Sequence, residues 1–113
     1  MYLIVFYIPK KHLEDVKKAM FNAGAGRIGN YDSCCWETDG RGQFKPLKGS
    51  APFQGAIDRI EHVDEVKVEM VCDKKNVVAA LKALVSAHPY ESPAYHAVEV
   101  MTLEELEYHD KPQ

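Results

Sequence analysis

The seven residues Tyr2–Ile8 have the sequence YLIVFYI, and Pro9 follows them. Aliphatic and aromatic side chains of this kind favour a β-strand, and the proline ends it. Because every position is apolar, we expect a central strand with apolar side chains on both faces of its sheet. From Lys11 to Ala23 the apolar residues recur at helical spacing, and Gly24 then supplies a helix stop. The chain is therefore expected to open with a strand and a helix.

The second half repeats this order of elements. Val66–Val71 alternates apolar and polar side chains, as in a strand with one buried face. Asp73 is expected to cap the following helix, which cannot easily pass His88 because Pro89 disfavours helical geometry in the residue before it. A last strand and a short acidic helix capped by Thr102 are expected at 94–101 and 102–108.

The middle of the chain is expected to form a long hairpin arm. The sequence predicts a strand at Tyr31–Thr38, a hairpin turn at Asp39–Gly42 and a short return arm at Gln43–Leu47. The neighbours Cys34 and Cys35 would then lie on that strand, with one side chain on each face. Either thiol is a candidate soft metal ligand, although a free cysteine is more often a small buried hydrophobe. Cys72 is expected in the core.

Two βαβ units in 113 residues indicate one α+β domain, a ferredoxin-like βαββαβ sandwich with a long hairpin arm between its second and third strands. We assign this domain to residues 1–101, and residues 102–113 to a C-terminal acidic tail or short helix. The two helices cover only one face of such a sheet. Since the first strand is apolar on both faces, association of several copies is the simplest cover for the other face.

Composition excludes several functions. Seventeen acidic residues against fourteen Lys and Arg give a net charge of −3, which argues against a nucleic-acid binder. No stretch supplies the ~20 apolar residues that span a bilayer, so no membrane association is expected. Three cysteines are no disulfide framework, and Met1–Ile8 lacks a basic leader. We therefore expect a cytoplasmic protein.

The segment 88–93 is the strongest candidate for a binding site. Its two prolines stiffen a loop that presents His88, Tyr90 and Glu91, and topology places this loop at the same end of the sheet as the arm. These three residues are therefore candidate ligand-binding residues. In the alternative interpretation, which the spacing alone favours, His88 caps the helix and Tyr90 packs in the core.

Other candidates depend on assembly. Trp36 and Phe44 are expected to anchor in a partner subunit, with packing inside their own subunit as the alternative. Glu69 is solvated unless an assembly buries its face, in which case it becomes a functional candidate. Asn30 and Tyr31 follow a glycine-bearing stretch and are expected to line a surface that a ligand meets.

Four motifs stand out along the chain: GAGRIGNYDSC at 24–34, GRGQFKP at 40–46, GSAP at 49–52 and HPYESPAY at 88–95. In their order and spacing they resemble the YqfO-type family of NGG-interacting-factor-three-like proteins. The similarity runs from Met1 to about Met101. Within that family the chain resembles a stand-alone version of the inserted domain, which is itself similar to CutA and PII-like proteins.

The resemblance implies a homotrimer with interlocking arms that binds a small molecule or a divalent metal ion in clefts between subunits, without catalysis of its own. It implies His88 and Glu91 as metal ligands, followed by Glu69 and Cys34. The family's dinuclear metal site uses flanking domains and is not carried over.

Two alternatives remain open at this stage. The first is a module for trimerisation or protein interaction, with Trp36, Phe44 and Tyr31 as contacts and a protein as partner. The second is a metal- or thiol-dependent hydrolase, for which the sequence does not bring together a nucleophile, a base and oxyanion donors.

Overall fold

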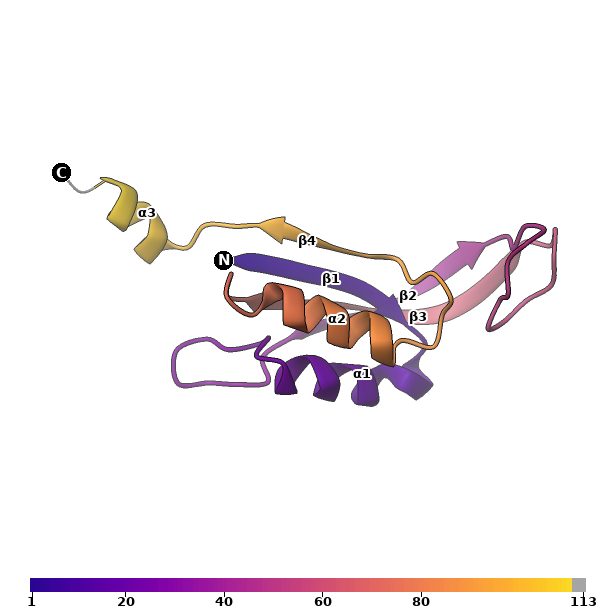
Figure 1. The fold of residues 1–113 in the computed structure, drawn as a ribbon, viewed down its shortest axis with the longest axis horizontal. Coiled ribbons are helices and arrows are strands. Elements are labelled where there is room, and N and C mark those ends of the chain that lie inside the picture. The colour runs from indigo at the N-terminus through magenta and orange to yellow at the C-terminus, as the bar shows by residue number, and fades with distance from the viewer. Residues whose placement is uncertain (111–113) are drawn as a thin grey trace.

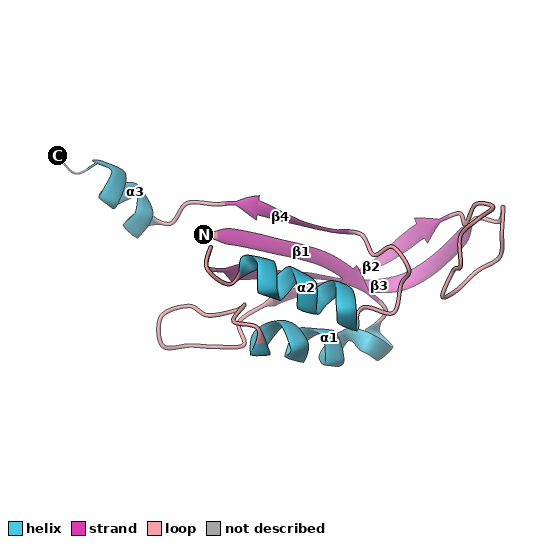
Figure 2. Cartoon of the chain, in the orientation of Figure 1, coloured by secondary structure: helices cyan, strands magenta, loops and turns pink. Residues whose placement is uncertain are grey.

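A computed structural model describes residues 1–110 of the chain. The four strands form one antiparallel sheet in the order β2-β3-β1-β4, and helices α1 and α2 pack side by side on one of its faces (Figures 1 and 2). This architecture confirms the predicted α+β, ferredoxin-like fold. The elements are β1 Tyr2–Ile8, α1 Lys10–Asn22, β2 Trp36–Phe44, β3 Glu61–Cys72, α2 Val77–Ala87, β4 Tyr95–Glu99 and α3 Leu103–Asp110.

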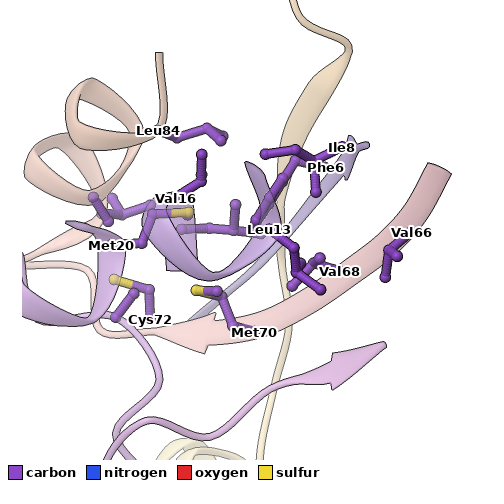
Figure 3. Packing of buried hydrophobic residues seen from close by; sticks show 14 residues of the cluster. Phe6, Ile8, Leu13, Val16, Met20, Val66, Val68, Met70, Cys72 and Leu84 are labelled. Atoms are coloured by element: carbon purple, nitrogen blue, oxygen red, sulfur yellow. The ribbon is translucent and has the colours of Figure 1, made fainter. Parts of the chain in front are cut away.

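The core lies between the sheet and the two helices (Figure 3). Strand β1 is central, as predicted, and turns Ile4, Phe6 and Ile8 toward the helices, where they are fully buried. These three residues lie opposite Met70, Val68 and Val66 of β3. Leu13, Val16 and Met20 of α1 and Leu84 of α2 complete the core, and Cys72 is buried as predicted. Apolar side chains at every second position of the strands thus pack against apolar side chains that recur at helical spacing in α1 and α2.

The opposite face of the sheet, here called the open face, is covered by no element among residues 1–110 (Figure 1). Strand β1 contributes Leu3, Val5 and Tyr7 to it, opposite Val71, Glu69 and Lys67 of β3. Trp36 lies across from Glu69 and is 70% exposed. The open face therefore combines apolar residues of β1 with a charged row on β3.

Strand β2 differs from its prediction. The turn expected at 39–42 is absent, because residues 36–44 form one extended strand paired with 61–69 of β3. Gly40 and Gly42 lie in this strand without positive φ angles, so their turn preference is overridden by the hydrogen-bonding partner that β3 offers. The arm is thus formed by longer strands and closes through the loop 45–60.

The two adjacent cysteines therefore precede β2 rather than lying on it. Their loop is fixed by backbone hydrogen bonds from Gly26 to Val71 and from Cys34 to Gly26, each 2.8 Å long. Cys35 packs against the core, whereas the Cys34 thiol lies 3.6 Å from the carbonyl oxygen of Asp32. The expected placement on two faces of one strand was wrong because the strand begins later.

The helix ends follow most of the predicted stops and caps. Gly24 ends α1 with a φ of +104°, and α2 stops before His88 and Pro89 as predicted. The Asp73 cap was wrong, because a turn intervenes and α2 begins after Asn76. Thr102 does cap α3, since its hydroxyl oxygen accepts the Glu105 N–H at 3.4 Å.

The short C-terminal helix was expected within 102–113, and residues 111–113 of that segment lie outside the described part. The division into 1–101 and 102–113 stays a prediction.

Candidate functional site

A cavity of about 570 Å³ lies where the arm, the loop 45–60 and the loop after α2 meet. The two loops are joined by Glu91, whose carboxylate oxygens accept the Ala51 N–H at 3.0 and 3.2 Å. The topology predicted that these segments meet at one end of the sheet, and the structure places them there. Several lining residues, Tyr7, Thr38, Gly40, Gly42, Glu65 and Lys67, belong to the open face.

Aromatic rings form much of the cavity wall. The Tyr90 ring lies 6.4 Å from Phe44 and 6.2 Å from Phe53, measured between centroids. Phe53 also makes an edge contact with His12 of α1, at 5.5 Å. These contacts anchor the loop 45–60 to the body of the domain. They also show Phe44 packing within its own subunit, which was the alternative to its predicted interface role.

A polar pair lies in the same wall. The Tyr90 hydroxyl donates a hydrogen bond of 2.8 Å to the Glu65 carboxylate. Burial, and then the hydrogen bond to Glu65 and its negative charge, raise the pKa of Tyr90 well above its usual range. A Cβ atom at Gly42 would collide with the Glu65 carboxylate, whereas one at Gly40 would meet open space. Gly42 therefore leaves room for the Glu65 carboxylate in the position where it binds Tyr90.

Sequence reasoning missed both Glu65 and Gly42. Glu65 is one of several polar residues of β3, and Gly42 was assigned to a turn. Neither sequence nor spacing distinguishes them, because their importance comes from Tyr90, which lies 25 residues away from Glu65.

His88 is buried, with 6% of its surface exposed, and both its ring nitrogens are engaged. Nδ1 accepts the Tyr90 N–H at 3.2 Å, so Nε2 carries the proton and donates to the Tyr7 carbonyl at 2.7 Å. Burial lowers the pKa of His88, which favours this neutral form. The side chain thus ties the 88–93 loop to β1 and positions Tyr90. A metal ion could bind His88 only by displacing one of these bonds.

The other predicted site residues lie elsewhere in the single chain. Asn30 and Tyr31 belong to a turn closed by the hydrogen bond from the Ile28 N–H to the Tyr31 carbonyl, on the loop between α1 and β2 and away from the arm (Figure 1). Cys34 follows on the same loop, and Glu69 lies on the open face, 3.4 Å from Lys67. None of these four lines the cavity.

Of the predicted ligand residues, Tyr90 and Glu91 line the cavity, and His88 contacts Tyr90 without lining it, whereas Asn30, Tyr31, Cys34 and Glu69 lie apart. Within residues 1–110, no three His, Cys, Asp or Glu side chains are grouped to hold a metal ion. No helix in that range is long and apolar enough to cross a membrane.

The sheet order, with two helices on one face, matches the fold of solved CutA proteins. Two solved structures share this fold at low sequence identity. CutA from Xylella fastidiosa matches with a TM-score of 0.66 and 22% identity over 95% of this chain and 90% of that one. A PII-like CutA from Nostoc matches with a TM-score of 0.66 and 16% identity over 96% of this chain and 89% of that one. At these identities the likeness concerns the fold alone.

Sequence similarity identifies the family. The chain is 46% identical over 91 residues to a "GTP cyclohydrolase 1 type 2 homolog" of Mycobacterium leprae and 44% identical over 92 residues to that of Bacillus subtilis, covering 80% and 81% of the chain. A Bacillus cereus protein related to NIF3 matches with a TM-score of 0.73 and 38% identity over 85% of this chain and 24% of that one. No family model matches the sequence.

The chain therefore belongs to the YqfO-type, NIF3-related family through the segment it shares with these relatives. It spans about a quarter of the length of the first two relatives, 24% and 25%. The resemblance found in the four sequence motifs is thus confirmed.

Proposed function

We propose that this chain is a small regulatory protein that assembles as a homotrimer and binds a small ligand at clefts between its subunits, without catalysis of its own. One observation carries the proposal, namely the cavity of about 570 Å³ at the end of the arm. Its volume falls within the range of small-molecule sites, about 300–1,000 Å³.

The cavity and the proposed assembly support each other. The cavity opens partly onto the open face, where Lys67, Thr38 and Gly40 line it. A second subunit covering that face would roof the cavity and desolvate its polar groups. The aromatic wall would supply apolar contact, and Glu65, Lys67 and Glu91 would supply polar contacts that orient a ligand. The cytoplasmic location that we propose rests on the cysteine usage.

A divalent metal ion is the alternative ligand. One solved neighbour is described as the periplasmic divalent cation tolerance protein CutA from Archaeoglobus fulgidus, at 16% identity. Glu91 and His88 are the ligands proposed from the sequence, with Glu69 and Cys34 joining only if a neighbouring subunit brings them close. The engagement of both His88 nitrogens makes the small-molecule proposal the stronger of the two.

The binding proposal can be tested by calorimetry on the assembled protein. ATP and zinc chloride are titrated separately into the wild type, into Ser92→Trp, which fills the cavity from its rim, and into Lys11→Trp as a control on exposed α1. We expect saturable heat for one probe, loss of that heat in Ser92→Trp and no change in Lys11→Trp. Absence of heat for both probes, or equal heat in all three proteins, would reject the ligand role.

A second candidate function is an interaction module without a ligand. The structural use of His88 favours it, because that role was expected for His88 in such a module. Trp36 and Tyr31, which are 70% and 74% exposed, would then be contacts with a protein partner, and Phe44 a further one.

The two candidate functions are distinguished by the heat of the two probes in the wild type. The buried, doubly hydrogen-bonded His88 predicts a lower melting temperature for His88→Ala under either function, so that result together with no heat from either probe supports the interaction module. The hydrolase alternative finds no cluster of three His, Cys, Asp or Glu side chains for a catalytic metal ion within residues 1–110, and the activity in the relatives' name concerns proteins more than three times as long.

A further inference from the structure

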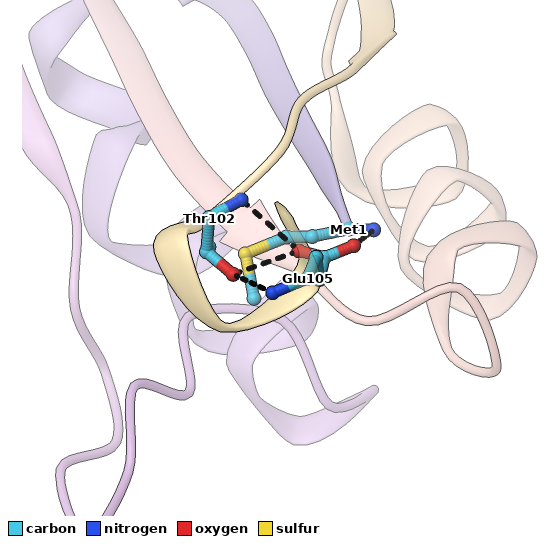
Figure 4. A network of polar contacts seen from close by, with 3 residues as sticks. All are labelled: Met1, Thr102 and Glu105. Atoms are coloured by element: carbon cyan, nitrogen blue, oxygen red, sulfur yellow. Dashed lines mark hydrogen bonds and ion pairs between the residues drawn. The ribbon is translucent and has the colours of Figure 1, made fainter. Parts of the chain in front are cut away.

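The C-terminal helix α3 has little cover in its own chain. It extends beyond the sheet, past the N-terminal end of β1 (Figure 1), and packs extensively on no other element among residues 1–110. The Met1 amino group lies 3.2 Å from the Glu105 carboxylate and, with the Thr102 cap, holds its first turn (Figure 4). Isolated helices shorter than ~12 residues are marginal in water, so eight residues need tertiary packing to persist.

Three exposed apolar side chains in and next to α3 could be buried by this packing. Leu103 and Leu106 are 71% and 49% exposed, and Met101 just before the helix is also exposed. Leu103 and Leu106 are three residues apart and therefore share one side of the helix. Glu104, Glu107 and Asp110 make α3 strongly acidic.

A matching surface lies on the far side of α2. A groove of about 380 Å³, here called the α2–β4 groove, is lined by Val78, Leu81, Lys82, Val85, Ser86 and Tyr95. Val78 and Val85 are exposed, and they recur at helical spacing with Leu81 between them. This groove presents an apolar stripe of the kind that accepts a short amphipathic helix.

The charges of the two surfaces are complementary. Lys82 borders the groove, and Lys74 and Lys75 precede α2. None of these lysines, and neither Glu104 nor Glu107, forms an ion pair within the part of the chain that the structure describes. Within residues 1–110, Glu104 and Glu107 on α3 and the lysines around the groove therefore have no ion-pair partner in their own chain, and each surface could supply one to the other.

We propose that α3 of one copy docks in the α2–β4 groove of a second copy. Within one chain, the Met1–Glu105 contact fixes α3 at the end of β1, from where it points away from the sheet (Figure 1). Between copies the contact is heterologous, since a helix meets a groove, and repetition around an axis closes a ring. The proposal does not depend on the ligand cavity.

The test is zero-length carbodiimide cross-linking of the full chain. Equal amounts of ¹⁴N- and ¹⁵N-labelled protein are unfolded and refolded together, cross-linked and analysed by mass spectrometry. We expect hybrid ¹⁴N–¹⁵N peptides joining Lys82 to Glu104 or Glu107. Lys82→Arg keeps the charge but removes the reactive amine, so it should lose these peptides and keep its assembly state. Exposed Lys11 on α1 should give no such peptide with α3.

A charge exchange provides the second measurement. Glu104→Lys with Glu107→Lys should weaken association several-fold in sedimentation velocity, and so should Lys82→Glu. The triple variant should recover it. Cross-links only between peptides of the same label, no cross-link in an intact assembly, or no recovery in the triple variant would each overturn the proposal, whereas none of them bears on ligand binding at the cavity.

Discussion

The two faces of the sheet receive similar side chains from β1 but have different surroundings. On the helix-covered face, Ile4, Phe6 and Ile8 are fully buried beneath α1 and α2. On the open face, Leu3 and Tyr7 are half-buried, and only Val5 is buried. The single chain therefore covers the helix side of β1 fully and its other side in part.

Strand β3 shows which face the fold treats as interior. Its helix-facing residues Val66, Val68 and Met70 are apolar, whereas Glu65, Lys67 and Glu69 face the other way. Burial of apolar area stabilises the first face within a single chain, at roughly 25 cal/mol per Å². The charged row on the second face keeps that face compatible with water in a single chain, because Lys and Glu are rarely buried without partners.

Removing a core ring should produce the largest effect. Phe6→Ala leaves a cavity beneath both helices and should lower the free energy of unfolding by about 3–5 kcal/mol. Urea denaturation followed by circular dichroism measures it. Val98→Ala on the half-exposed edge of the open face is the control and should cost far less. Equal losses in the two variants would contradict the difference between the faces.

The open face should show its effect in association instead. Trp36→Ala should weaken self-association by about 2 kcal/mol, the size of an interfacial hot spot, because the exposed indole is the largest side chain on that face. Sedimentation equilibrium over a concentration series measures this, and Trp36→Phe should retain most of the affinity. A wild type that remains a single chain at every concentration would remove the basis for a covered open face.

Two glycines of β2, Gly42 beside the Glu65 carboxylate and Gly40 in open space, allow a matched comparison at the cavity. Gly42→Ala should push the Glu65 carboxylate off the Tyr90 hydroxyl and cost about 1 kcal/mol, whereas Gly40→Ala should be neutral or slightly stabilising. Because the Glu65 charge raises the pKa of Tyr90, that pKa should fall in Gly42→Ala and not in Gly40→Ala. NMR titration of the tyrosine rings measures it, and an unchanged Tyr90 would show that Glu65 does not need the space.

The smallest effect concerns pH. Burial lowers the pKa of His88 in the folded state below the unfolded value of about 6.5. The unfolded chain therefore binds the proton first, so the contribution of His88 is complete above pH ~6.5 and is lost as the pH falls through its lower folded pKa. The free energy of unfolding should drop more between pH 7.5 and pH 5.5 in the wild type than in His88→Gln. Parallel pH profiles would show that His88 is not held neutral.

Local sequence predicted the element ends that are marked by a proline, a glycine or a capping threonine. Strand β1 has the predicted bounds, since its apolar run ends at Pro9, and the glycine stop at Gly24 and the Thr102 cap are where the residues indicated. Strand β2 was misplaced because Asp39–Gly42 has turn composition, and only the extended partner β3 makes it a strand.

The candidate site was predicted in part. The two prolines and the topology correctly placed Tyr90 and Glu91 at the arm, but the predicted roles of His88 did not specify its bonds to Tyr7 and Tyr90. Glu65 and Gly42 escaped because their roles arise from contacts between residues distant in sequence. The interface roles of Trp36 and Phe44 stay predictions.

The sequence by itself determined the order of strands and helices, the side of β3 that faces the core, and the family to which the shared segment belongs. These properties follow from periodicity, chain breakers and short motifs, which are local. The tertiary structure decided how the arm pairs, what Gly42 makes room for and which groups His88 binds. These contacts join segments that are far apart in the sequence, and a local sequence pattern does not tell which of them come within hydrogen-bonding distance.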